Sequence, residues 1–230
     1  MKAVLFDLDG TLTDPREGIT RCIAYALERM GVEVPPLERL TFAIGPPLRA
    51  SLAQLLGRDD AASVEQALAH YRERFADVGL FENEPYEGIA EVLRAVRRSG
   101  AALIVCTSKP LVYARRIVEH FGLHVHFDAI HGCELDGTRE DKRELMEYLL
   151  PLHGVASAQA AMVGDRGVDM RAARHHGLHA IGALWGYGSE RELREHGAQV
   201  LCDSPRDLVA VLHLPSDAHA EPARDPPEPR

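Results

Sequence analysis

The sequence predicts an α/β protein built on a parallel sheet, with an α-helical domain inserted after the first strand. Short, almost entirely apolar runs recur along the chain, and such runs are typical of strands that are buried on both faces. A stretch with helical spacing of apolar residues follows most of these runs. One segment, residues 15–84, breaks this alternation and contains helical patterns only.

The candidate strands are runs of residue types that are usually buried. The first is residues 3–7 (Ala-Val-Leu-Phe-Asp), and the others are residues 101–106, 127–130, 160–163 and 179–184. Helical spacing follows at residues 111–121, 140–150, 168–175 and 190–195. Because the connections between parallel strands are right-handed, this alternation predicts a Rossmann-like core with helices on the sheet.

The segment between the first strand and residue 84 is predicted to form an α-helical cap over the sheet. Residues 17–30 place apolar side chains at helical spacing, and residues 48–56 and 61–76 also have helical character. Pro85 and Gly88 mark the return of the chain to the core. We therefore expect a core of residues 1–14 and 85–213, a cap of residues 15–84, and a disordered, proline-rich tail of residues 214–230.

The composition excludes several classes of protein. The chain has 230 residues and a formal net charge of −9, which argues against a nucleic-acid polymer as partner and against an anionic membrane surface. Asp7 follows the start too closely for a signal peptide, and the four cysteines form no CxxC pair. We expect a cytoplasmic protein that is a monomer or a small homo-oligomer.

Two carboxylates follow the first predicted strand. Asp7 and Asp9 are two residues apart, so their side chains can face one site, and Gly10 permits a sharp turn there. Like charges at this spacing favour either a bound cation or a raised pKa for one carboxyl group. An ordinary Asp-Gly turn explains the same residues equally well when they are taken alone.

Polar residues follow two further predicted strands. Thr107 and Ser108 come after the strand at residues 101–106 and could hold an anion, although a helix N-cap is the simpler explanation. Asp165 and Asp169 come after the strand at residues 160–163, where acids also suit a helix N-terminus. Because the carboxyl ends of parallel strands meet at one edge of a sheet, these residues and Asp7 should converge.

Lysine is rare in this chain. There are three lysines among 26 basic residues, and two of them, Lys109 and Lys142, lie in candidate site segments. A compact ammonium group suits a site that needs a point charge rather than a planar guanidinium. A lysine, a hydroxyl group and two pairs of carboxylates together suit a hard cation beside a phosphate.

With these motifs in order, the chain resembles the haloacid dehalogenase superfamily of phosphohydrolases, in particular the phosphoglycolate phosphatase and bacterial 5′-nucleotidase branch. The motifs are Asp7-Leu8-Asp9-Gly10-Thr11, Thr107, Lys142, and Gly164-Asp165 with Asp169, and the resemblance covers about residues 2–212. Four further stretches resemble the 5′-nucleotidase-like group, namely Ile44-Gly45-Pro46-Pro47-Leu48, Thr107-Ser108-Lys109-Pro110, residues 134–139 and residues 184–188. Gly167 and Val168 depart from that group, where bulkier, more polar residues stand.

The resemblance implies a Mg²⁺-dependent phosphomonoesterase that acts on a small phosphorylated metabolite, such as a 5′-nucleotide or phosphoglycolate. It implies that Asp7 is the nucleophile that forms an aspartyl-phosphate, and that Asp9 is the general acid and then the general base. Thr107 and Lys142 complete the implied catalytic set. The implied metal ligands are Asp7, the Asp9 carbonyl and Asp165, supported by Thr11 and Asp169. The implied substrate-binding residues are Leu8, Gly10, Ser108, Lys109 and Arg49.

Three alternatives share parts of this pattern. A sugar phosphomutase on the same scaffold would return the phosphoryl group to the sugar. A phosphoacceptor signalling module also uses acids, a hydroxyl group and a lysine around Mg²⁺, but the large helical insertion argues against it. A dehalogenase would also use an aspartate nucleophile, whereas Asp9 supplies the acid and base that phosphoryl transfer needs.

Overall fold

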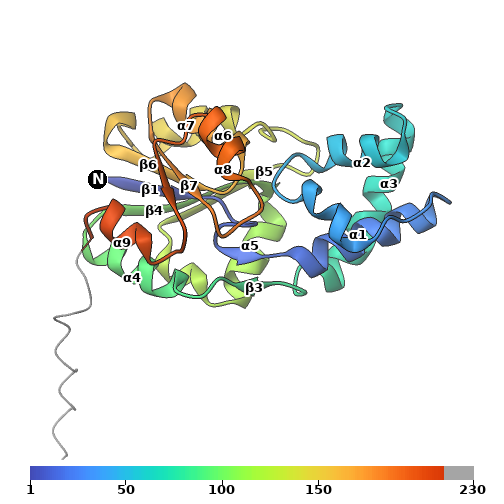
Figure 1. Ribbon diagram of the computed structural model, residues 1–230, viewed down its shortest axis with the longest axis horizontal. Helices are drawn as coiled ribbons and strands as arrows, with labels where there is room; N and C mark the ends of the chain where they lie inside the picture. The colour runs from blue at the N-terminus through green and yellow to red at the C-terminus, as the bar shows by residue number, and fades with distance from the viewer. Residues whose placement is uncertain (215–230) are drawn as a thin grey trace, which may run out of the picture.

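The core of the molecule is a six-stranded, fully parallel sheet. The computed structural model describes residues 1–214, and its sheet has the strand order β5-β4-β1-β6-β7-β8 (Figure 1). The strands are β1 (Ala3–Phe6), β4 (Ala102–Pro110), β5 (Ala129–Cys133), β6 (Ala160–Gly164), β7 (His179–Ala183) and β8 (Val200–Cys202). This sheet confirms the predicted α/β, Rossmann-like fold class. The predicted disordered tail lies, except for residue 214, outside the described residues.

The side chains of the central strands alternate between two hydrophobic clusters. In β1, Val4 and Phe6 belong to one cluster, whereas Ala3 and Leu5 belong to the other. All four residues are buried, which explains why β1 appears in the sequence as an unbroken apolar run. The alternation is a consequence of strand geometry, in which successive side chains point to opposite faces.

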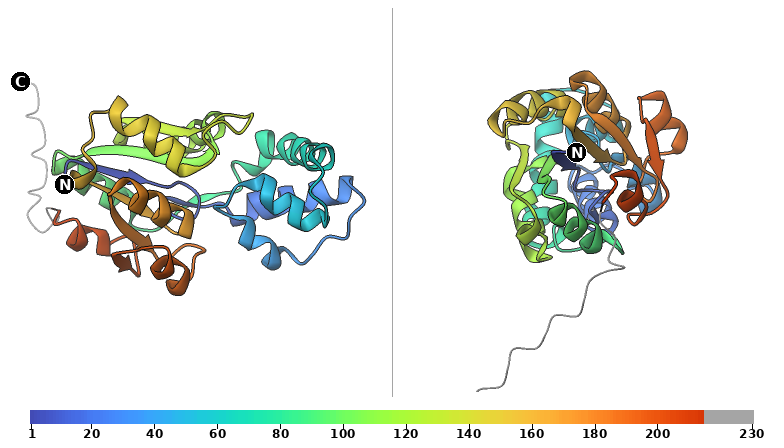
Figure 2. Two further views of the ribbon diagram at one scale, coloured as in Figure 1. Left: turned by 90° about the horizontal axis from the view of Figure 1, so that it is seen from above. Right: turned by 90° about the vertical axis from the view of Figure 1, so that its left-hand side faces the viewer.

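Helices cover both faces of the sheet. Buried residues of α4 (Ile89–Arg98), α5 (Leu111–His120) and α9 (Asp207–Val211) join the cluster that contains Phe6. Those of α6 (Lys142–Leu152), α7 (Gly167–His176) and α8 (Glu190–Glu195) join the cluster that contains Leu5. Figures 1 and 2 show these two groups of helices on opposite sides of the strands. The result is a three-layer core.

A second lobe stands beyond the carboxyl edge of the sheet. It contains α1 (Arg16–Arg29), the 3₁₀ segment η1 (Leu37–Ala43), α2 (Leu48–Leu56), α3 (Ala61–Arg74) and the π-helical turn η2 (Phe75–Gly79). The chain enters and leaves this lobe through a short antiparallel ribbon of β2 (Thr13–Asp14) and β3 (Glu84–Pro85) (Figure 2). The division of the chain into a core and a cap at residues 14 and 85 stays a prediction. We call residues 15–84 the cap.

Several elements differ from the sequence-based expectations. The edge strand β5 lies at Ala129–Cys133 instead of residues 127–130, and α6 begins at Lys142 because the side chain of Asp141 caps it, accepting a hydrogen bond from Arg143 N at 2.8 Å. The sequence analysis missed β2, β3, α4, β8 and α9. Apart from α4, these elements are two to five residues long, so they carry no hydrophobic period. Within residues 1–214, no helix has the length and apolar character of a membrane span.

Candidate active site

The residues predicted from separate motifs meet at the carboxyl edge of the sheet. Asp7 directly follows β1, Thr107 lies in the last part of β4, and Asp165 directly follows β6. Lys142 is the first residue of α6, and Asp169 lies in the first turn of α7. All five side chains are buried. The neighbouring strands β4, β1 and β6 therefore bring together residues that are far apart in the sequence.

Lys142 is the central cation of this cluster. Its Nζ lies 3.0 Å from Asp7 Oδ2 and also donates a short hydrogen bond to Asp169 Oδ1. Burial by itself would lower the pKa of Lys142, but Asp169 and Asp7 outweigh burial, and the pKa is raised above its ordinary value. Lys142 therefore stays charged and places a positive charge beside Asp7.

Three carboxylates form a compact acidic triad of Asp7, Asp165 and Asp169. One oxygen of each lies within 4.8 Å of the others. Burial, followed by the charges of the other two acids, raises the pKa of Asp165. Burial also raises the pKa of Asp169 to about 6, against the opposing effect of Lys142. A bound cation would relieve this repulsion, and carboxylate oxygens are the ligands that Mg²⁺ prefers, so the residues present fit this metal.

The metal ligands implied by the resemblance agree only partly with this triad. Asp7 and Asp165 belong to it, and Asp169, expected only as a support, lies equally close to the other two carboxylates. The side chain of Asp9 is directed elsewhere, so its expected contribution would come from its backbone carbonyl. Thr11 supports Asp165 as expected, because its hydroxyl group donates to Asp165 Oδ1 at 3.2 Å.

Asp9 faces the cap side of the site. Its Oδ2 lies 2.8 Å from Lys109 Nζ, whereas its buried Oδ1 has no hydrogen-bond partner among residues 1–214. Burial raises the pKa of Asp9, and Lys109 opposes this effect. Lys109 Nζ also lies 4.4 Å from the centroid of the Phe75 ring of the cap. Asp9 is thus positioned to hold a proton close to the space between cap and core.

The loop after β7 fixes the position of Asp165. Tyr187 N donates to Asp165 Oδ2 at 2.8 Å, and Trp185 Nε1 donates to the carbonyl of Thr11 at 3.0 Å. A Cβ atom at Gly186 would lie 2.3 Å from Asp165 Cβ, so only glycine permits this approach. From the sequence, residues 185–188 could be either a flap near the site or a contact patch, and their contact with Asp165 was not predicted.

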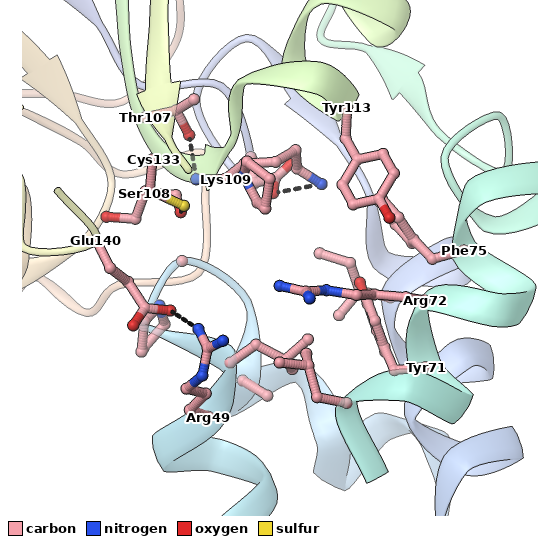
Figure 3. A pocket seen from close by; sticks show the side chains of 18 of the residues that line it. Arg49, Tyr71, Arg72, Phe75, Thr107, Ser108, Lys109, Tyr113, Cys133 and Glu140 are labelled. Carbon is pink, nitrogen blue, oxygen red and sulfur yellow. Dashed lines mark hydrogen bonds and ion pairs between the residues drawn. The ribbon is translucent and has the colours of Figure 1, made fainter. Parts of the chain in front are cut away.

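A cavity lies between the cap and the core (Figure 3). Asp7, Asp9 and Thr107 line its inner end. The predicted substrate-binding residues Ser108, Lys109 and Arg49 also line it. Leu8 and Gly10 do not. The Leu8 side chain is fully buried in the hydrophobic core, and its backbone N–H donates to Asp7 Oδ1 at 2.8 Å.

The outer wall of the cavity belongs to the cap. Arg49 at the start of α2 lies beside Glu140, and Arg72 of α3 extends into the middle of the cavity (Figure 3). Tyr71 and Phe75 stack with ring centroids 5.1 Å apart, and Tyr113 of α5 meets the edge of Phe75. The sequence analysis named Arg49 but missed Arg72, because an isolated arginine in a helical pattern carries no distinguishing signal.

Comparisons with known proteins agree with this arrangement. The chain matches the family described as haloacid dehalogenase-like hydrolase over residues 4–183. It is 50% identical to a 5′-nucleotidase of Pseudomonas aeruginosa, with 92% of this chain and 94% of that protein covered. It is 26% identical to a phosphoglycolate phosphatase of Aliivibrio fischeri, with 93% and 97% covered. The crystal structure of a predicted phosphatase from Clostridium acetobutylicum superimposes with a TM-score of 0.89 at 38% identity, with 92% and 98% covered.

Proposed function

The chain belongs to the haloacid dehalogenase-like hydrolase family, and from this premise we propose that it is a Mg²⁺-dependent phosphomonoesterase that works through an aspartyl-phosphate on Asp7. The observation that carries the proposal is the environment of Asp7. Its carboxylate is buried, is 3.0 Å from the ammonium group of Lys142, and belongs to an acidic triad suited to Mg²⁺. These conditions place the proposed nucleophile beside a fixed positive charge and next to a site that can accept a phosphoryl group.

The chemistry divides into two displacements at phosphorus. A carboxylate oxygen of Asp7 forms a bond to phosphorus while the bond from phosphorus to the ester oxygen breaks, and Asp9 gives its proton to that oxygen. Asp9 then takes a proton from a water molecule, whose oxygen attacks phosphorus and releases phosphate and the Asp7 carboxylate. The raised pKa of Asp9 suits the first role, and the nearby Lys109 suits the second.

The neighbouring groups stabilise the phosphoryl oxygens. Thr107 Oγ1 accepts a hydrogen bond from Lys109 N at 3.2 Å, which leaves the hydroxyl hydrogen of Thr107 able to donate to a phosphoryl oxygen. Lys142 supplies a fixed positive charge on the other side. A Mg²⁺ ion held by Asp7, Asp165 and the Asp9 carbonyl, with Asp169 close by, would neutralise charge on the phosphoryl group.

The proposed substrate is a small phosphorylated metabolite. The cavity lies between the cap and the core, and sites for small molecules occur preferentially at such an interface between two lobes. A nucleoside 5′-monophosphate and phosphoglycolate both fit this description, and the named relatives act on substrates of these two kinds. We also propose that the protein works in the cytoplasm, supported by four free, buried cysteines.

The direct test is phosphate release from a panel of phosphate esters, with and without Mg²⁺, by the wild type and by Asp7→Asn. We expect Mg²⁺-dependent release by the wild type and none by the variant, with an unchanged circular dichroism spectrum. Asp59→Asn, which neutralises an exposed carboxylate of the cap, is the matched control and should keep full activity. Wild-type turnover by Asp7→Asn would contradict the proposal.

The same assay separates the proposal from its alternatives. A phosphomutase would convert a sugar phosphate to its isomer without stoichiometric phosphate release. A signalling module would hold a slowly hydrolysed phosphoryl group on Asp7 and show no turnover. Halide release from a haloacid, without phosphatase activity, would identify a dehalogenase.

A further inference from the structure

The wall of the cavity that faces Asp7 and Thr107 carries two arginines from the cap. Arg49 begins α2, and Arg72 lies near the end of α3. Both donate to one acceptor on the core, the carbonyl oxygen of Leu135, at 3.4 Å and 2.7 Å respectively. The two guanidinium groups are therefore neighbours, but their surroundings differ.

Arg49 already has carboxylate partners. Its Nε lies 2.6 Å from Glu65 Oε1, and its Nη1 lies 3.7 Å from Glu140 Oε1. Two acidic side chains therefore balance its single positive charge, and its fork of donors is largely used. Arg49 can shape the wall of the cavity, but a substrate that bound it would have to compete with Glu65.

Arg72 has no such partner. Its only hydrogen bond among residues 1–214 is the one to the Leu135 carbonyl, and no carboxylate of these residues lies within 4.0 Å of it. The nearby acid Glu134 is itself paired with Arg139 at 2.5 Å. The guanidinium group of Arg72 extends from α3 into the open middle of the cavity (Figure 3). It is a partly buried cation with unused donors that face a ligand space.

The other cations of the cavity are already paired. Lys109 pairs with Asp9, and Lys142 pairs with Asp7 and Asp169. The aromatic residues beside Arg72 carry no charge: Tyr71 and Phe75 stack on each other, and burial raises the pKa of Tyr71, which keeps its hydroxyl group neutral. Arg72 is thus the group in this wall with both a charge and free donors to offer a ligand.

Resting on the proposed function, we propose that Arg72 determines specificity by binding two adjacent hydrogen-bond acceptors at the far end of the substrate's leaving group. A guanidinium group presents parallel N–H donors that match such a pair in one plane. Two chemical sources present this pattern, a carboxylate and the keto edge of a nucleobase, as in O6 and N7 of guanine. A leaving group with a single hydroxyl group, or with a donor beside the acceptor, does not match it.

Arg72 also has a structural contact that the test must separate from recognition. Its hydrogen bond to Leu135 joins α3 to the core loop after β5, so its loss can loosen the cap for every substrate. Recognition of an acceptor pair, in contrast, affects only substrates that carry the pair. The two roles therefore differ in how the loss of activity is distributed among substrates.

The experiment measures kcat/KM for two matched pairs of substrates and for phenyl phosphate, which has no distal acceptor. The first pair is phosphoglycolate and 2-hydroxyethyl phosphate, and the second is IMP and AMP, in which an amino group replaces O6. IMP presents the same O6 and N7 acceptors as guanine and, like AMP, has no 2-amino group. The enzymes are the wild type, Arg72→Met, Arg72→Lys and the control Arg58→Met, which removes an exposed arginine of the cap. Circular dichroism confirms the fold of each variant.

We expect the wild type to prefer the acceptor-bearing member of one pair by roughly 5- to 150-fold, the range of one bidentate contact. Arg72→Met should abolish that preference, chiefly by raising KM, and leave phenyl phosphate nearly unchanged. Arg72→Lys should restore part of it, and Arg58→Met should match the wild type. The pair that shows the preference identifies the source, a carboxylate or a nucleobase.

Two results would overturn the inference while leaving the proposed function in place. One is a wild type that hydrolyses both members of each pair equally well. The other is an equal fall in kcat/KM for all five substrates in Arg72→Met, which would mean that Arg72 only holds the cap. If the wild type released no phosphate from any substrate, the proposed function would fail, and this inference with it.

Discussion

At the scale of single residues, the site concentrates charge where water is excluded. Asp7, Asp165 and Asp169 share a buried space with one ammonium group, that of Lys142, so the acids outnumber the cation there. Burial, together with the charges of the neighbouring acids, raises the pKa values of Asp165 and Asp169. This imbalance suits a site that is completed by a divalent cation.

The raised pKa values predict how stability and metal binding depend on pH. The pKa of Asp169 rises from 3.8 to about 6 on folding. At pH values between these two pKa values, the metal-free folded state therefore holds a proton on Asp169 that the unfolded state has lost. The stabilising contribution of that proton is full below about pH 4 and is lost as the pH rises through about 6. Because Mg²⁺ must displace the proton, its stabilising effect should grow with pH.

Urea unfolding with Mg²⁺ or with EDTA, at about pH 5 and about pH 7.5, measures this effect. We expect Mg²⁺ to raise the free energy of unfolding more at the higher pH, by on the order of 1–3 kcal/mol. Asp169→Asn, which removes the titrating group, should reduce the difference between the two pH values. Equal stabilisation by Mg²⁺ at both pH values in the wild type would contradict the prediction.

Gly10 offers a test of how closely the first motif packs against Asp165. Its φ of +80° lies in the left-handed region, and a Cβ atom there would lie 2.2 Å from Asp165 Oδ2. Gly31 has a similar φ of +68°, but no atom lies within 4 Å of the corresponding position. Both Gly→Ala variants therefore share the backbone cost of about 1 kcal/mol, and Gly10→Ala alone also displaces Asp165, a proposed metal ligand.

Isothermal titration with Mg²⁺ and urea unfolding compare the two glycine variants. Gly31→Ala should lose about 1 kcal/mol of stability and bind Mg²⁺ as the wild type does. Gly10→Ala should lose more stability and most of its Mg²⁺ affinity. Wild-type affinity for Mg²⁺ in Gly10→Ala would show that Asp165 is not held against this turn as described.

Much of the site was predictable at this scale, because each motif follows a strand of a parallel sheet. Asp7, Thr107 and Asp165 could be placed together from the apolar runs before them. The position of Asp169 inside the triad and the partner of Asp9 could not be predicted. Both depend on which carboxylates Lys109 and Lys142 contact, and the three-dimensional packing of the chain determines these contacts.

At the scale of secondary-structure elements, the central strands were predicted best and the edges worst. Strands β1 and β6 are buried on both faces and form unbroken apolar runs. The edge strand β5 is only half buried over most of its length, and β8 has three residues, so neither has a clear pattern. The ribbon of β2 and β3 is two residues long in each strand and depends on tertiary pairing.

One element-scale contact links the metal-site loop to the cap. Arg166, between Asp165 and Asp169, donates from Nη1 to the carbonyl groups of Phe42 and Ile44 in the cap, and its Nε lies 3.1 Å from Glu192 of α8. A Cβ atom at Gly45 would lie 2.6 Å from Arg166 Cγ, so the cap loop lies directly on this side chain. The contact stabilises the closed position of the cap.

Replacing Arg166 should therefore weaken closure more than it weakens the core. We expect Arg166→Met to raise KM by roughly 10- to 150-fold, in line with the loss of charge-assisted hydrogen bonds worth about 1.5–3 kcal/mol, and to lower kcat less. Arg171→Met, which removes an exposed arginine of the same helix, should leave both constants unchanged. Steady-state kinetics on the best substrate of the panel measures both, and an unchanged KM in Arg166→Met would contradict the role of this contact.

At the scale of the whole molecule, the acidic surface and the cap restrict the substrate. The net charge of −9 disfavours long polyanions, whereas Arg49, Arg72 and Lys109 bring positive charge into the lining of the cavity, beside its acidic residues. Residues of both the cap and the core line the cavity, and Figure 2 shows these two lobes next to each other. A small phosphate ester can enter such a site, and a polymer cannot be enclosed by it.

This arrangement predicts that chain length limits activity. A mononucleotide and an oligonucleotide with the same 5′-phosphate present the same reacting group, but only the mononucleotide fits beneath a closed cap. We expect phosphate release from the mononucleotide and far slower release from the oligonucleotide at equal concentrations of 5′-phosphate. Equal rates for the two would contradict the enclosing role of the cap.

The most direct test of the account as a whole is to trap the phosphoryl group on Asp7. Borohydride reduces an acyl phosphate to an alcohol, so wild-type enzyme quenched during turnover with Mg²⁺ should contain homoserine in place of Asp7, as peptide mass spectrometry would show. The account predicts this change at Asp7 only during turnover, and none in enzyme without substrate. Steady phosphate release with no reduction at Asp7, or with reduction at another carboxylate, would contradict it.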